Sequence, residues 1–174
     1  MPKSSILSLL QGGDRRSIGR SNEVAARVLE NPRLFPTLIS GLWHDDPLVR
    51  MRAADAAEKI TRQLPELLVP HKKELLGLMA ETEQADVRWH LSVIAPRFLL
   101  SIKERQLVMS LLMSYLQDRR SIVKTLALQG LADLAHTDPA IRMEVRELLQ
   151  QAARSGTPAM KARSRKLLKK LLGY

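Results

Sequence analysis

Residues 45–60 read DDPLVRMRAADAAEKI, and this stretch decides the fold. Asp46 precedes Pro47, which is typical of a helix start: the carboxylate accepts a bond from a free backbone N–H, and the proline has no N–H that needs a partner. Apolar residues then recur at helical spacing from Val49 to Ile60. Many of them are alanines, which let a neighbouring helix approach closely. The stretch predicts a turn followed by a buried helix.

The same pattern recurs along the chain. In four segments an apolar residue is followed by a basic one, and the apolar residues are Val49, Val87, Val123 and Met160. They are separated by 38, 36 and 37 residues, a period typical of stacked helical hairpins. No run follows the strand period of two. We therefore predict an all-α protein, an α-solenoid of about five hairpins in a single domain, 1–174. The expected hairpins are about 4–30, 32–64, 65–99, 101–136 and 138–172.

Other helix boundaries are signalled in the same way. Three further capping side chains stand before a proline, in Asn31-Pro32, Asp138-Pro139 and Thr157-Pro158. Ser101 with Glu104 predicts a capping box. Pro96 falls inside an expected helix, which it should kink or end.

Residues 45–60 also resemble a HEAT repeat. In that family an Asp lies in the turn, a Val-Arg pair opens the second helix, and an alanine-rich apolar pattern follows. The fourth hairpin keeps Asp118, Val123 and Lys124. The segments at residues 87–90, 121–124 and 158–161 together look similar to small bacterial HEAT-repeat-containing proteins of unassigned function. The resemblance implies a right-handed α-solenoid whose second helices line a concave face, and it implies little chemistry, because a fold does not fix a function.

The excess positive charge lies at the two ends of the chain. The net charge is +10: residues 1–20 contribute +3, residues 151–174 contribute +7 without a single acid, and residues 21–150 are balanced. A basic end can attract nucleic acid or another polyanion. Basic residues also serve as the polar caps that keep a repeat protein soluble.

Four basic residues hold the same position in consecutive repeats: Arg50, Arg88, Lys124 and Lys161. Parallel stacking would place them in a row about 8–10 Å apart, a spacing at which cations can track phosphates. The structural alternative is that each pairs with an aspartate in a turn, such as Asp118.

Trp89 lies about 200° around its helix from Val87, away from the core of its own hairpin. Met51 and Thr125 hold the same position in neighbouring repeats. If the second helices line a groove, Trp89 stands near its centre and anchors a partner; otherwise it packs against adjacent repeats. The predicted partner-binding residues are Arg50, Met51, Arg88, Trp89, Lys124 and Thr125.

The expected C-terminal helix is strongly basic. Its cations surround a narrow apolar stripe, and as an alternative site they would bind a polyanion: Lys161, Arg163, Arg165, Lys166, Lys169 and Lys170. The plainer interpretation is a terminal capping helix.

No catalytic pattern is present, so we expect no enzyme activity, no cofactor and no metal. The chain has no glycine-rich phosphate loop, nucleophile elbow or paired metal-binding histidines. Some alkylpurine DNA glycosylases are built on HEAT-like repeats, but Trp43 and Trp89 do not match their aromatic and carboxylate constellation.

The leading hypothesis is a non-enzymatic scaffold that binds a protein or peptide partner on its concave face. The alternative is nucleic-acid binding through the basic ends and the cationic row. Cysteine is absent, no apolar run is long enough for a signal peptide, and none approaches the ~20 residues of a membrane span, so we expect a cytoplasmic protein. The sequence does not indicate the oligomeric state.

Overall fold

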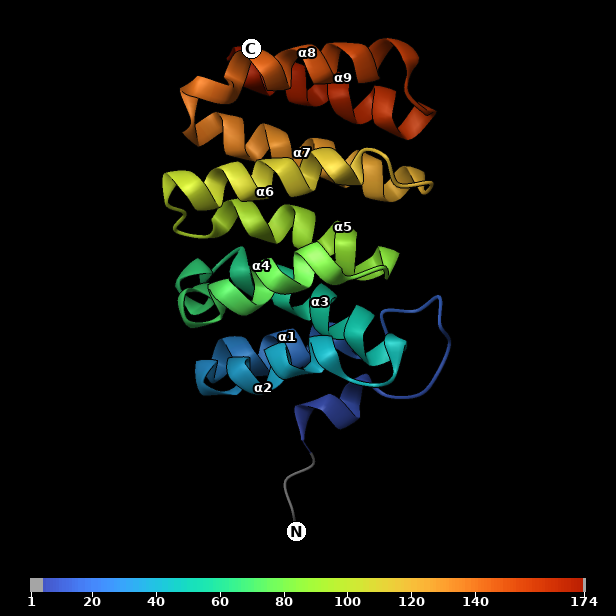
Figure 1. The fold of residues 1–174 in the computed structure, drawn as a ribbon. Helices are drawn as coiled ribbons and strands as arrows, with labels where there is room; N and C mark the ends of the chain where they lie inside the picture. Colours follow the sequence, from blue (N-terminus) through green and yellow to red (C-terminus); the bar gives the residue numbers. More distant parts are fainter. Residues whose placement is uncertain (1–4, 174) are drawn as a thin grey trace. The chain divides into compact units, whose positions relative to one another are not determined.

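A computed structural model describes residues 5–173, which form helices joined by turns and one longer loop before α1 (Ser21–Glu30), with no strand among them (Figure 1). The prediction of an all-α protein is confirmed for this part of the chain. The contacts divide the chain into two units, Met1–Leu78 and Met79–Tyr174. They are called the N-terminal and C-terminal units below.

The N-terminal unit is organised around α3 (Pro47–Thr61). Before it come a 3₁₀ helix, Ile6–Leu10, then α1 (Ser21–Glu30), the 3₁₀ turn Pro32–Leu34, α2 (Phe35–Ser40) and the 3₁₀ turn Gly41–Trp43. After it come the 3₁₀ helix Pro65–His71 and α4 (Lys72–Glu81), which contains the boundary between the units. Helix α3 packs on both α1 and α2, and the residues of its predicted apolar face are buried.

A buried arginine fixes the loop that precedes α1. The Arg52 side chain is almost fully enclosed, with the residue 2% exposed. Its guanidinium donates to four backbone carbonyls of the loop, those of Leu10, Gly12, Asp14 and Ser17, at 2.6–3.1 Å. Gly19 has φ +54°, and a Cβ there would lie 2.6 Å from the Arg52 Cζ. Arg52 therefore holds the loop through carbonyl dipoles, and Gly19 gives its guanidinium room.

The C-terminal unit is organised around α7 (Ser121–Thr137). Its other elements are α5 (Ala85–Ile94), the 3₁₀ turn Ala95–Arg97, α6 (Ile102–Tyr115), the 3₁₀ turn Pro139–Ile141, α8 (Arg142–Ser155) and α9 (Pro158–Leu172). Helix α7 lies between α5 and α9 and also packs on α6 and α8 (Figure 1). Gly130 allows the approach to α5, because a Cβ there would lie 2.2 Å from the Ser92 carbonyl oxygen.

Most of the predicted helix starts are confirmed. The side chains of Asp46, Asp138 and Thr157 each accept a hydrogen bond from a backbone N–H within the next three residues. Ser101 and Glu104 form the reciprocal capping box. These helix starts can be predicted from local sequence because each capping side chain accepts a hydrogen bond from a free backbone N–H in the first turn of its own helix.

Two other local predictions have different outcomes. Asn31 does not cap the turn at Pro32, so that prediction is wrong. Asn31 ends α1, where its backbone N–H donates to the Arg27 carbonyl, and its side chain makes no capping bond. Pro96 acts as predicted, because α5 ends at Ile94 and a 3₁₀ turn follows.

Candidate partner-binding surface

Two members of the predicted cationic row are engaged with the turn before their own helix. The Arg50 guanidinium donates to the carbonyls of His44 and Asp45 at 2.7 and 3.0 Å. The Arg88 Nε donates to the Thr82 carbonyl at 2.7 Å. Each arginine therefore ties the start of its helix to the turn that leads into it.

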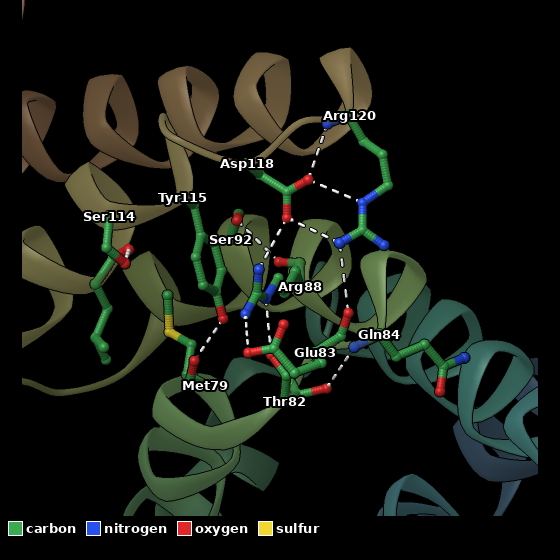
Figure 2. Close-up of polar contacts among 11 residues, drawn as sticks. Met79, Thr82, Glu83, Gln84, Arg88, Ser92, Ser114, Tyr115, Asp118 and Arg120 are labelled. Atoms are coloured by element: carbon green, nitrogen blue, oxygen red, sulfur yellow. Dashed lines mark hydrogen bonds and ion pairs between the residues drawn. The ribbon is translucent and has the colours of Figure 1, made fainter.

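Arg88 also binds Asp118, an aspartate in the turn between α6 and α7, as Figure 2 shows. Its Nη1 lies 2.9 Å from Asp118, its Nη2 lies 2.9 Å from Glu83, and its guanidinium lies 5.2 Å from the centre of the Tyr115 ring. Arg120 approaches Asp118 from the other side, with its Nε at 2.8 Å. The Asp118 side chain is only 1% exposed. For Arg88 the structural alternative, pairing with a turn aspartate, is the observed arrangement.

The electrostatics of this cluster favour a fixed structural role. Hydrogen bonds from Arg120 and then Arg88 hold the pKa of the Asp118 carboxyl well below its usual range. Burial raises the pKa of the Tyr115 phenol, whose hydroxyl donates to the Met79 carbonyl at 2.5 Å. The Asp118 carboxylate and the Tyr115 hydroxyl are therefore both engaged in hydrogen bonds within the C-terminal unit. Neither group is available to react with a ligand.

Of the three residues at the predicted anchor position, only Thr125 is buried. Thr125 is buried, and its hydroxyl donates to the Ser121 carbonyl at 2.7 Å, so its side chain is unavailable to a partner. Trp89 is half-buried; its ring stacks on His90 with centroids 3.6 Å apart, and its N–H donates to Asp86. Met51, in the N-terminal unit, is also half-buried. The prediction is therefore wrong for Thr125, because its helix α7 packs on both α5 and α9 and the burial around α7 extends further than one hairpin alone requires.

The open face of α7 lies instead along Ile122, Leu126, Gln129 and Asp133. These residues follow one another at intervals of four, three and four, which places them on one side of a helix. Ile122 is 48% exposed and the other three are half-buried. Relative to Thr125, the centre of this stripe is turned by roughly 70°, at about 100° per residue. The repeat alignment alone did not reveal it, because the exposed sector depends on which neighbours cover α7.

Three cations of α9 lie on one side of that helix. Arg163, Lys166 and Lys170 are all exposed and are spaced by three and four residues. Arg163 donates to the Gln129 side chain at 2.9 Å, and Lys170 lines a small depression with Asp133. We call Ile122, Leu126, Gln129, Arg163, Lys166 and Lys170 the α7–α9 surface.

Asp133 is the acidic residue at the border of the α7–α9 surface. Burial raises the pKa of its carboxyl, against the opposing effect of a hydrogen bond from Gln129 and the charges of Lys170 and Arg97. The remaining predicted cations of α9 are placed differently: Arg165 and Lys169 are exposed on other sides of the helix, and Lys161 is half-buried.

Neither a metal centre nor a membrane span emerges from the described residues. Within residues 5–173, no group of three or more His, Cys, Asp or Glu side chains is arranged to hold a metal ion. No helix in this part of the chain is long and apolar enough to cross a membrane. Comparison with known proteins gave no match, neither to a protein-family model nor to a curated protein.

Proposed function

We propose that this chain is a cytoplasmic, non-enzymatic helical-repeat scaffold of the HEAT type. In this proposal the α7–α9 surface of the C-terminal unit binds an acidic protein or peptide partner. The helix-to-helix contacts support the repeat: α5, α7 and α9, which carry equivalent segments of the sequence, pack as successive neighbours. That arrangement is expected when right-handed helical hairpins stack in register.

The charge and exposure of α9 carry the proposal. Arg163, Lys166 and Lys170 project from a helix that contains no acidic residue, so no carboxylate on the same helix neutralises them. Ile122 and Leu126 add exposed or half-exposed apolar area on the neighbouring helix. A partner that presents acidic residues beside an apolar one would match both features, since complementary charge guides association and apolar contacts hold the complex.

Charge reversal on the α7–α9 surface tests this function. A protein with Arg163→Glu and Lys166→Glu should keep its helical circular dichroism and lose a specific partner, with capture falling by about tenfold or more. The measurement is affinity capture from the source cells under crosslinking, with quantitative mass spectrometry of the recovered proteins.

The matched control is the pair Lys103→Glu and Arg146→Glu. These exposed cations lie on α6 and α8, and their reversal changes the net charge by the same amount. The control protein should keep the partner. If both variants recover the same proteins in the same amounts as the unchanged chain, the α7–α9 surface is not the binding surface.

Nucleic-acid binding is the second candidate, and the acid-free composition of α9 favours it. The discriminating measurement is fluorescence anisotropy with single-stranded and duplex DNA probes at rising salt. Phosphate contacts release counterions, so nucleic-acid affinity should fall steeply between about 50 and 200 mM salt. Absence of binding at the lowest salt would eliminate this candidate and leave the protein partner.

A further inference from the structure

A second surface of the C-terminal unit has the features of a peptide-binding groove. An open groove of about 300 Å³ lies where the turn between α6 and α7 meets the turn between α8 and α9. Its apolar residues are Leu116, Leu128, Leu148, Ala152 and Met160, and its polar residues are Gln117, Lys124, Gln151, Ser155 and Thr157, together with Gly156. The groove uses the opposite side of α7 from Ile122 and Leu126, so it is separate from the α7–α9 surface.

Within the described part of the chain, Lys124 is the only charged residue that lines the groove, and no acid lines it. Among residues 5–173, the Lys124 ammonium has no hydrogen bond or ion pair to another side chain, in contrast to Arg88 at the equivalent position of the preceding repeat. A lysine at the edge of an apolar groove favours an anionic group that can bind the ammonium while an attached apolar group occupies the floor. Charge complementarity therefore selects an acidic occupant.

The polar rim favours a peptide. The side-chain amides of Gln117 and Gln151 likewise make no hydrogen bond within the described residues, and each amide can both donate to and accept from a peptide backbone. Gly156 lines the groove where α8 and α9 meet closely, because a Cβ there would lie 2.5 Å from the Ala152 carbonyl oxygen and 2.8 Å from the Met160 Cβ. The floor is thus apolar and the rim is suited to backbone hydrogen bonds.

We infer that this groove binds a short peptide segment in which a leucine-like side chain is followed or preceded by an Asp or Glu. The apolar side chain occupies the floor, and the carboxylate pairs with Lys124. This inference rests on the proposed scaffold function, since the segment belongs to a protein partner, but it depends on different residues from those of the α7–α9 surface.

The test uses the full chain, labelled with ¹⁵N, and two synthetic peptides. The probe is acetyl-Glu-Leu-Leu-Glu-amide, and the charge-inverted control is acetyl-Lys-Leu-Leu-Lys-amide. The acidic probe should give saturable chemical-shift changes at the amides of Lys124, Gln151 and Met160, with a dissociation constant on the order of 1 mM for so small a contact. The cationic peptide should leave these amides unchanged.

Two variants examine the groove directly. Lys124→Met keeps the length of the side chain and removes the charge, and should weaken the acidic probe about fivefold, as expected for a half-exposed ion pair. Ser155→Trp, at an exposed position, should fill the groove and abolish the shifts. Lys103→Met, which removes an exposed lysine elsewhere, should have no effect.

The inference fails if the acidic probe causes no saturable shift at the groove, if both peptides shift it equally, or if Ser155→Trp leaves the affinity unchanged. These outcomes are separate from those of the proposed function, which is tested through the Arg163 and Lys166 variant. Peptide binding in the groove without any partner capture would refute the scaffold function while supporting the groove.

Discussion

Replacing Asp118 with alanine should destabilise the C-terminal unit by about 2–4 kcal/mol. The hydrogen bond from Arg88 is charge-assisted and its acceptor is buried, which makes it worth about 1.5–3 kcal/mol. The bond from Arg120 adds roughly 1 kcal/mol or less, because that side chain is 35% exposed. Arg88 keeps its bonds to Thr82 and Glu83, so the cost should not reach the roughly 5 kcal/mol seen when a buried charge is left alone.

The two tryptophans allow this cost to be measured in one unit. Trp43 lies in the N-terminal unit and Trp89 in the C-terminal unit, so a Trp43→Phe background leaves Trp89 as the reporter. Urea unfolding followed by Trp89 fluorescence and by far-UV circular dichroism gives the free energy of unfolding. The midpoint of thermal unfolding should fall by roughly 4–16 °C, at about 2–4 °C for each kcal/mol.

Glu147→Ala is the control, because Glu147 is an exposed acidic residue of α8 in the same unit as Asp118 and Trp89. It should change the free energy of unfolding by no more than about 0.5 kcal/mol. If Asp118→Ala costs as little as this control, then the guanidinium–carboxylate cluster contributes nothing, and the structural role assigned to Arg88 is wrong.

The same carboxylate predicts a pH dependence. The pKa of Asp118 is lower in the folded protein than in the unfolded chain, because Arg120 and Arg88 stabilise its ionised form. Its contribution is therefore complete above the unfolded pKa of about 4 and is lost as the pH falls through the folded pKa. Asp118→Asn should lie well below the unchanged protein in stability at pH 7 and approach it in acid. A constant difference from pH 7 down to pH 2 would contradict the assigned cause.

Three further outcomes follow from other contacts. Arg52→Met should free the loop of residues 11–20 and raise its rate of cleavage by trypsin about tenfold or more, because the free energy of local opening would fall by at least ~1.4 kcal/mol. An unchanged rate would show that the four hydrogen bonds to backbone carbonyls do not hold the loop. Gly130→Ala should lower the free energy of unfolding, measured in urea, by about 1–3 kcal/mol, because the new methyl group would collide with the Ser92 carbonyl. An unchanged free energy would mean that α5 and α7 separate easily. Asp133→Asn should stabilise the protein at pH 7 and have no effect at pH 3, because a carboxyl whose pKa is raised by burial makes the folded protein less stable as the pH rises. Destabilisation at pH 7 would show that burial does not raise the pKa of Asp133.

Local signals were the part of the fold that the sequence predicted well. The all-helical content of residues 5–173, the capping box at Ser101 and the helix end at Pro96 are present in the structure. Each depends on groups within about one turn of backbone, so the neighbouring sequence already contains the physical cause. Asn31 is the exception: it ends α1 without capping the next turn, whereas Asp138 ends α7 and also caps the turn that follows it.

The sequence by itself determined that this chain forms amphipathic helices with a repeated spacing, and that α9 carries many cations and no acid. Tertiary structure alone decided which of the polar residues are available. In the folded chain Arg88 forms an ion pair with Asp118 and Thr125 is buried. Ile122 and Lys124 lie on two different exposed sides of α7. The physical reason is that helical periodicity fixes the angle between side chains, whereas exposure depends on how many neighbouring helices cover each side, and those neighbours are distant in the sequence.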